Sequence, residues 1–230
     1  MKKIIVLLTA ILMIGYACQA QVGKPATYKY IKKVFGEPNY KQITSYFIFN
    51  SANSVTWCIE SSDGYIFPIA FGSCNLSKHS MVFQRSISSF MGFHQKSSIQ
   101  FSIFQKNGGL VISSKDNPGS LLDDSGTTQL RKCDYVLTPS NKLVGSGWKF
   151  EDRNTKEKLV LYFKSKTEVL LDGEPRGYIM IGNTVGILSG DNPAKEALVG
   201  KFYGQKLNLH RSGYRTKSDD YPWFEMSKTN

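Results

Sequence analysis

The chain has 230 residues, of which 41% are hydrophobic and 13% aromatic, and its formal net charge is +11. This length supports one large domain or two small ones, and the high aromatic fraction favours strands, so we expect an all-β protein. A basic balance suits nucleic acid, an anionic glycan or a membrane surface, but the export signal described next argues against nucleic acid as the partner.

Residues 1–20 are predicted to be a secretory signal peptide. Lys2 and Lys3 precede an apolar run over residues 4 to about 17, and small residues follow it. The run is too short to stay in a bilayer as a permanent anchor, so no transmembrane segment is expected. We therefore expect an exported protein that is periplasmic, associated with the outer membrane or extracellular.

The signal can be processed in two ways, and the sequence leaves both open. Cleavage after Ala20 suits a signal peptidase that reads small residues, and the mature chain then begins at Gln21. Lipidation of Cys18 is the alternative, although Gly15 and Tyr16 depart from the usual lipobox before such a cysteine.

A first β repeat is expected over residues 41–114, after a basic lead-in segment at residues 21–40 that contains a short candidate strand at 28–30. Apolar side chains alternate there with the period of two that a half-buried strand shows. The predicted strands are 43–50, 54–60, 64–71, 80–83, 99–105 and 110–113. Residues 85–98 interrupt the pattern with apolar side chains that cap the core or line a ligand entrance.

A linker is predicted at residues 115–142, where Asp, Asn, Gly, Pro and Ser concentrate, with one weak strand at 135–137. A second β repeat follows at residues 143–212, and one helical turn is expected near Pro193 because an N-cap candidate precedes this proline. The remaining residues, 213–230, form a polar tail whose aromatic cluster we expect to pack on a sheet.

The second repeat looks like a copy of the first. Its central part, residues 158–188, reads as a strand, a tight turn, a strand, a glycine-containing turn and two further strands. The residues that recur at nearly constant spacing are Phe49 with Phe163, Val55 with Val169 and Tyr65 with Tyr178. This pattern predicts an internal duplication, although amphipathic hairpins resemble one another in any case. Whether the halves close into one barrel or form two small domains stays open.

The start of the second repeat carries a family resemblance. Gly147-Trp148 and Phe150 are followed by the strand at 159–163 and the turn Gly182-Asn183-Thr184. This pattern resembles the small lipocalin-like (calycin-type) β domains that Gram-negative bacteria export. The resemblance covers only the C-terminal part, and it implies an antiparallel barrel or half-barrel, a tryptophan across its floor and an apolar ligand. The spacing of Gly145 and Gly147 before the tryptophan departs from the lipocalin signature.

Cysteine and histidine usage predicts no metal site and no cofactor. The cysteines outside the signal are Cys58, Cys74 and Cys133, so an exported chain can form one disulfide, and all three pairings stay open. None of them has metal-like spacing, and the histidines that could join them are far apart in the sequence, at His79, His94 and His210.

No motif points to catalysis, and no catalytic residue is proposed from the sequence. The segment 145–147 lacks the spacing of a nucleophile elbow, and the paired aspartates at 123–124 and 219–220 would point to opposite faces of a strand. We expect a non-catalytic β protein, with a hydrolase of unrecognised site as a remote alternative.

Two non-catalytic functions are weighed. In the first, a barrel or sandwich binds a small apolar or glycan ligand in a cavity lined by aromatic side chains, for which the candidates are Trp57, Tyr65, Phe67, Phe163 and Tyr178. In the second, the protein is a structural or interaction protein of the cell envelope, and the same side chains fill its core. A cavity of several hundred Å³ would favour the first function, and a filled interior would favour the second.

Overall fold

The computed structural model describes residues 25–33, 42–51, 53–61, 63–84, 98–114, 126–152, 155–188, 197–212 and 223–229. Within these ranges the chain forms strands and turns and no helix, which confirms the predicted all-β fold. Accordingly, these ranges hold no helix with the length and apolar character needed to cross a membrane. The helical turn expected near Pro193 and the interruption at residues 85–97 lie outside the described residues.

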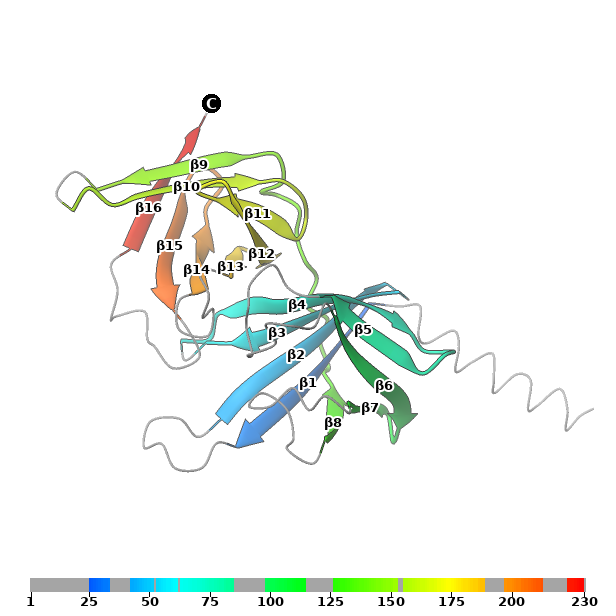
Figure 1. Ribbon diagram of the computed structural model, residues 1–230. Coiled ribbons are helices and arrows are strands. Elements are labelled where there is room, and N and C mark those ends of the chain that lie inside the picture. Colours follow the sequence, from blue (N-terminus) through cyan, green and yellow to red (C-terminus); the bar gives the residue numbers. More distant parts are fainter. Residues whose placement is uncertain are drawn as a thin grey trace, which may run out of the picture.

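The strands form two closed antiparallel barrels, one after the other along the chain (Figure 1). The first barrel consists of β1 (Ala26–Lys33), β2 (Gln42–Ser51), β3 (Ser54–Glu60), β4 (Ile66–Asn75), β5 (Ser80–Gln84), β6 (Ser98–Lys106), β7 (Gly109–Ser113) and β8 (Thr127–Lys132). Each strand pairs with its neighbour in sequence, and β8 pairs with β1 to close the barrel.

The second barrel repeats this arrangement. It consists of β9 (Gly147–Glu151), β10 (Lys158–Phe163), β11 (Glu168–Leu171), β12 (Glu174–Ile181), β13 (Thr184–Ile187), β14 (Ala197–Phe202), β15 (Leu207–Ser212) and β16 (Trp223–Thr229). Pairing of β16 with β9 closes it. From the sequence, the two halves could form either one barrel or two small domains. The structure shows two barrels of eight strands each.

Alternation of side chains accounts for the strands. Along β10, exposed residues alternate with the buried Leu159, Leu161 and Phe163, so one face of the strand lines the barrel interior. The turn into β12 uses Asp172 and Gly173, which both have positive φ. This is the conformation that a two-residue hairpin of type I′ requires, and aspartate and glycine adopt it at low cost.

Aromatic rings occupy the middle of the first barrel. Trp57 on β3 stacks on Phe47 of β2 with the ring centroids 5.2 Å apart, and it meets Phe101 on β6 at 6.1 Å. Phe83 on β5 contacts all three rings. An eight-stranded barrel is just wide enough to be filled by side chains or to hold one small ligand. Here rings from separate walls meet, so side chains fill this part of the interior.

The second barrel is packed in the same way. Trp148 on β9 reaches Phe202 on β14, with ring centroids 5.9 Å apart, and its indole Nε1 donates a hydrogen bond of 2.8 Å to Ser146 Oγ. Phe163 and Tyr178 contact each other at 4.8 Å. All these rings except that of Phe202 are at most 1% exposed, so this barrel too has an aromatic core.

The duplicated hairpins have the predicted register. Phe49 pairs with Val55 across β2 and β3, and Phe163 pairs with Val169 across β10 and β11. All four side chains are buried. Because the second and third strands of each barrel carry the pairs, the two pairs occupy equivalent places in the two barrels.

The third predicted equivalence, Tyr65 with Tyr178, is wrong in register. Val169 pairs with Arg176, close to Tyr178, whereas Val55 pairs with Gly72, far along β4 from Tyr65. The reason is the length of the third strand, since β3 has 7 residues and β11 has 4. Tyr65 therefore lies in the turn before β4, while Tyr178 lies inside β12.

The first barrel extends beyond the first predicted repeat. The predicted lead-in segment supplies β1 and the predicted linker supplies β8, because eight strands are needed to close the barrel. The predicted tail supplies all of β16, and its Phe224 is buried in the second barrel. The weak strand predicted at residues 135–137 does not form, and Pro139 makes only an isolated bridge to Ile181.

The two barrels pack against each other, with β4 of the first beside β12 and β13 of the second (Figure 1). Tyr46, Ile48 and Cys58 point outward from β2 and β3 and form an apolar cluster with Ile179 of β12. The barrels approach closely at Gly186 on β13, where a Cβ atom would collide with the backbone of Ile66 and Phe67. Only glycine, which has no side chain, fits at this position.

Candidate functional site

A pocket of about 320 Å³ opens where the two barrels meet, and we call it the junction pocket. Four parts of the chain line it: the first barrel with Pro25 next to it, the segment that connects the barrels, the turn between β10 and β11, and β12. Its lining residues are Pro25, Asn50, Ser54, Thr56, Phe71, Leu137, Thr138, Pro139, Lys166, Thr167 and Ile179. The volume is at the lower end of the range for small-molecule sites.

The first barrel contributes an amide with unused hydrogen-bonding capacity. Asn50 Nδ2 donates a hydrogen bond of 3.4 Å to Thr56 Oγ1. Asn50 Oδ1 is buried and has no hydrogen-bond partner in the described part of the chain. Since buried polar atoms are nearly always paired, this oxygen is an acceptor suited to a ligand donor. Phe71, half-buried on β4, adds an aromatic wall.

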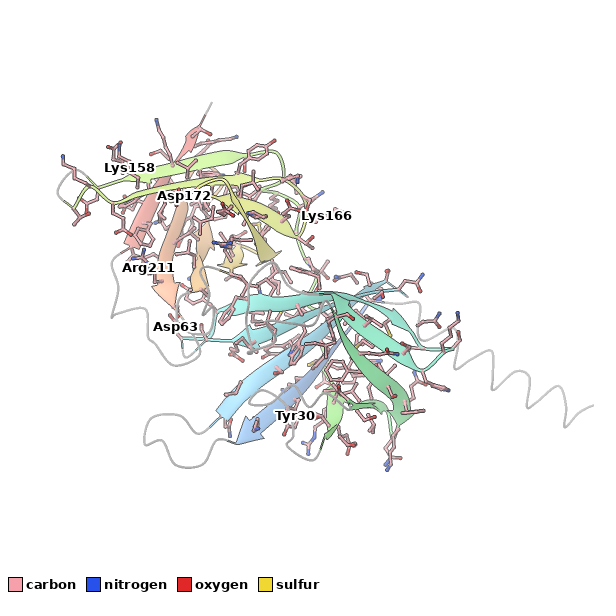
Figure 2. The ribbon with its side chains drawn as sticks, in the orientation of Figure 1. Tyr30, Asp63, Lys158, Lys166, Asp172 and Arg211 are labelled. Atoms are coloured by element: carbon pink, nitrogen blue, oxygen red, sulfur yellow. The ribbon has the colours of Figure 1, made fainter. Side chains whose placement is uncertain are left out.

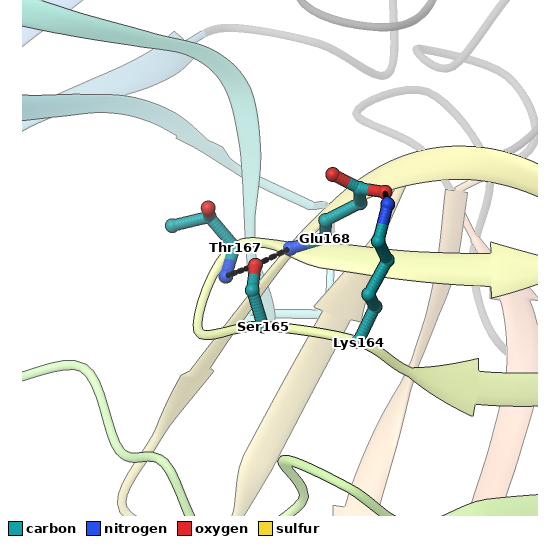
Figure 3. Close-up of polar contacts among 4 residues, drawn as sticks. All are labelled: Lys164, Ser165, Thr167 and Glu168. Carbon is teal, nitrogen blue, oxygen red and sulfur yellow. Dashed lines mark hydrogen bonds and ion pairs between the residues drawn. The ribbon is translucent and has the colours of Figure 1, made fainter.

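The turn between β10 and β11 is held by its own hydrogen bonds (Figure 3). Ser165 Oγ accepts from the backbone N–H groups of Thr167, at 3.3 Å, and Glu168, at 3.1 Å. Lys164 Nζ forms an ion pair of 2.9 Å with Glu168 Oε1. Lys166, between these residues, forms no ion pair with any described residue and lines the pocket, so its charge remains available.

Tyr178 connects this turn to the core of the second barrel. Its hydroxyl donates a hydrogen bond of 2.7 Å to the carbonyl oxygen of Ser165. Its backbone N–H donates a hydrogen bond of 3.0 Å to the carbonyl oxygen of Thr167. Burial raises the pKa of the Tyr178 phenol to about 12, which keeps it protonated as a donor. The pocket wall that carries Lys166 is therefore anchored.

The five residues predicted to bind a ligand do not line the junction pocket. Trp57 and Phe67 are fully buried in the first barrel, and Phe163 and Tyr178 are fully buried in the second, so the structure does not bring the set together. The indole Nε1 of Trp57 has no hydrogen-bond partner among the described residues. Tyr65, partly buried, lies at the seam between the barrels.

A second group of polar side chains, the seam cluster, consists of Asp63, Tyr65, His210 and Ser212. Ser212 Oγ on β15 donates a hydrogen bond of 3.1 Å to Asp63 Oδ1, which ties the second barrel to the turn before β4. Figure 2 labels Asp63 in this turn. The rings of Tyr65 and His210 meet at 5.3 Å. Burial, and then the nearby charges of Asp63 and Tyr203, raise the pKa of Tyr65. The cluster joins the barrels.

The seam cluster contains serine, histidine and aspartate, but not in the geometry of a catalytic triad. His210 Nδ1 faces the carbonyl oxygen of Arg211 at 3.1 Å, and Nε2 has no partner among the described residues. Neither nitrogen is placed to take a proton from a serine hydroxyl. No three metal-ligating side chains gather anywhere in the described ranges.

The three cysteines that the sequence left open for pairing are all free. Cys58, Cys74 and Cys133 are each buried, and none is bonded to another. Burial raises the pKa of the Cys74 thiol to about 11 and raises those of the other two above the usual value. Because only the thiolate reacts readily, these groups are inert in the folded protein.

Sequence reasoning missed the junction pocket because its lining comes from strands and turns far apart in the chain. The residues predicted to bind a ligand were large aromatic side chains. In eight-stranded barrels such side chains fill the core. One signal was available, since the polar turn at Ser165 to Thr167 was recognised as a hairpin. Its position beside the first barrel requires knowledge of how the two barrels pack.

A comparison of the chain with protein-family models gives no match, and comparisons with curated proteins and with solved structures give none either.

Proposed function

We propose that this protein is an exported, non-catalytic binding protein whose ligand site is the junction pocket rather than the interior of either barrel. The observation that carries the proposal is the pocket of about 320 Å³, lined by residues of both barrels and of the segment between them. It combines apolar walls with a few polar groups, the usual composition of a small-molecule site. A small apolar or glycan ligand fits this lining.

The packed barrel interiors support the same placement of the site. The aromatic candidates contact one another across each barrel, so their energetic role is core packing. The proposed kinship with exported lipocalin-like domains rests on the closed eight-stranded barrel and on Trp148, which is buried across the second barrel. The proposed ligand position differs from the interior cavity that this kinship implies.

The test is a nuclear magnetic resonance titration of the protein with two neutral probes, benzyl alcohol and D-glucose. At least one of them should shift the side-chain amide of Asn50 and the backbone amide of Thr167 in a saturable way. Replacement of Ser54, an exposed residue at the pocket, by tryptophan should abolish these shifts. Ser102→Trp, at an exposed serine of β6, is the matched control and should keep them. If neither of these probes nor D-glucuronate, the acidic counterpart of glucose, shifts the pocket signals, the proposal is wrong.

A second candidate function is that of an envelope interaction protein that binds anionic polymers. Lys29 on β1 lies directly opposite Arg131 on β8, and Lys132 lies opposite Tyr28. Like charges opposite each other repel, and an anionic partner would relieve this repulsion. Retention on a heparin column should fall in the double variant Lys29→Gln/Arg131→Gln. The control variant Lys158→Gln/Lys164→Gln removes two lysines that are engaged in ion pairs.

Export is also part of the proposal, supported by the order of charged, apolar and small residues in residues 1–20. The intact mass of the protein recovered from outside the cytoplasm should correspond to a chain that begins at Gln21. A mass that includes a diacylglycerol group on Cys18 would instead select the lipidated form, and retention of Met1 would overturn export.

A further inference from the structure

We propose that the junction pocket selects an acidic sugar or a similar ring-shaped hydroxy-carboxylate, with Lys166 as the group that recognises the anion. This inference rests on the proposed function, because it names the ligand class of the same site. It is carried by three features of the lining: the charge balance, the state of Lys166 and the unused oxygen of Asn50.

The charge balance of the lining favours an anion. Among the described residues that line the pocket, Lys166 is the one that carries a charge, and no carboxylate accompanies it. A neutral acceptor forms only an ordinary hydrogen bond with the ammonium group, whereas a carboxylate next to it forms a stronger, charge-assisted one.

The turn leaves Lys166 free while it neutralises the neighbouring lysine. Lys164 is paired with Glu168, and the backbone on both sides of Lys166 is fixed by Ser165 Oγ and by the hydroxyl of Tyr178. Binding therefore orders the Lys166 side chain on a turn whose own hydrogen bonds, shown for Ser165 in Figure 3, are already formed. This preorganisation reduces the entropic cost of holding the anion.

The first barrel supplies the complementary contacts. Asn50 lines the pocket, and its Oδ1, which has no hydrogen-bond partner among the described residues, is the acceptor that we assign to a hydroxyl donor such as that of a sugar. Thr56 Oγ1 already accepts from Asn50 Nδ2, which fixes the orientation of the amide. Phe71 and Ile179 offer apolar surface to a ring. A ligand with an anion, a hydroxyl group and a compact ring uses all of these features together.

The experiment compares D-glucuronate with D-glucose in nuclear magnetic resonance titrations of the full-length protein. The two sugars differ only at C6, where glucuronate carries a carboxylate in place of the hydroxymethyl group of glucose. We expect glucuronate to shift the amide signals of Asn50 and Thr167 with an affinity about three- to tenfold higher than that of glucose. Added salt should reduce this difference, since Lys166 is exposed. Lys166→Gln should abolish the preference, whereas Lys206→Gln, which removes an exposed lysine away from the pocket, should retain it.

Each alternative outcome is informative. If glucose and glucuronate shift the same pocket signals with equal affinity, the proposed charge recognition is wrong while the binding function stands. An equal loss of preference in both lysine variants would mean that net charge, rather than Lys166, is responsible, and would also overturn the inference. If glucuronate shifts no pocket signal while benzyl alcohol does, the pocket binds an apolar ligand and the acidic-sugar class is wrong.

Discussion

The hydroxyl of Tyr178 donates a hydrogen bond of 2.7 Å to the carbonyl oxygen of Ser165. Tyr178 belongs to the core of the second barrel, and Ser165 belongs to the turn that forms one wall of the junction pocket. The bond therefore connects the packing of a barrel to the shape of the proposed site.

Tyr178→Phe should lower the free energy of unfolding by about 1 to 3 kcal/mol, because the carbonyl oxygen of Ser165 then loses its partner. The ring contact with Phe163, at 4.8 Å, would be kept. Urea unfolding of the variant and of the unchanged protein measures the difference. Equal stability of the two proteins would show that the hydrogen bond does not form in solution.

Alkaline pH should destabilise the protein through the same residue. The phenol of an unfolded tyrosine has a pKa of about 10, and burial raises that of Tyr178 to about 12. The contribution to stability is therefore complete below pH about 10 and falls as the pH rises toward 12, by about 1.4 kcal/mol per pH unit. Tyr178→Phe should show a shallower decline in this window. Parallel profiles for the two proteins would contradict the assignment.

Because the two hairpins are equivalent, truncation of equivalent residues should lower the free energy of unfolding by similar amounts. Truncation of Phe49 or of Phe163 to alanine should each lower the free energy of unfolding by about 3 to 5 kcal/mol, because each ring is buried against its own barrel. Phe104→Ala removes a ring that is 46% exposed and should cost less than about 1 kcal/mol. A small effect at only one of the two buried positions would argue against equivalent barrels.

The close packing of the two barrels predicts that substitution of Gly186 strongly destabilises the protein. Gly186→Ala places a methyl group against the backbone of Ile66 and Phe67, which cannot move as a side chain can. We expect a loss of about 1 to 3 kcal/mol from overpacking and an increase in the radius of gyration measured by small-angle X-ray scattering as the barrels separate. A variant with unchanged stability and dimensions would mean that the barrels do not pack as described.

The buried cysteines predict slow thiol chemistry. Cys58, Cys74 and Cys133 should react with Ellman's reagent only when the protein unfolds, because their raised pKa values and burial suppress the thiolate. The measurement is the rate of reaction with and without denaturant. Rapid reaction of the folded protein, or fewer than three reactive thiols among these residues after unfolding without reductant, would contradict the free, buried state.

Much of the fold could be predicted from the sequence because strand signals are local. Alternation in β10 and the matched spacing of Phe163 and Val169 with Phe49 and Val55 predicted both the hairpins and their register. Side-chain direction alternates strictly along a strand, so such spacing specifies which face is buried. The equivalence of Tyr65 and Tyr178 failed because it crossed a turn, and strand lengths on either side of a turn vary freely.

The extent of the barrels and the site were less predictable, since both depend on contacts between distant segments. The first barrel closes because Tyr28 and Lys29 on its first strand pair with its eighth strand. β1 and β8 can therefore be recognised as part of the barrel only from this long-range pairing. The junction pocket depends on how one closed barrel packs on another. Gly186 marks this contact, but in the sequence it looks like any other strand glycine.

Titration with D-glucuronate, followed by nuclear magnetic resonance, locates the ligand either in the junction pocket or inside a barrel. We expect saturable shifts at Asn50 and Thr167 and unchanged indole N–H signals of Trp57 and Trp148, whose rings lie in the barrel cores. Shifts at either indole, with the amides of Asn50 and Thr167 unmoved, would place the ligand inside a barrel and show that the junction pocket is not the binding site.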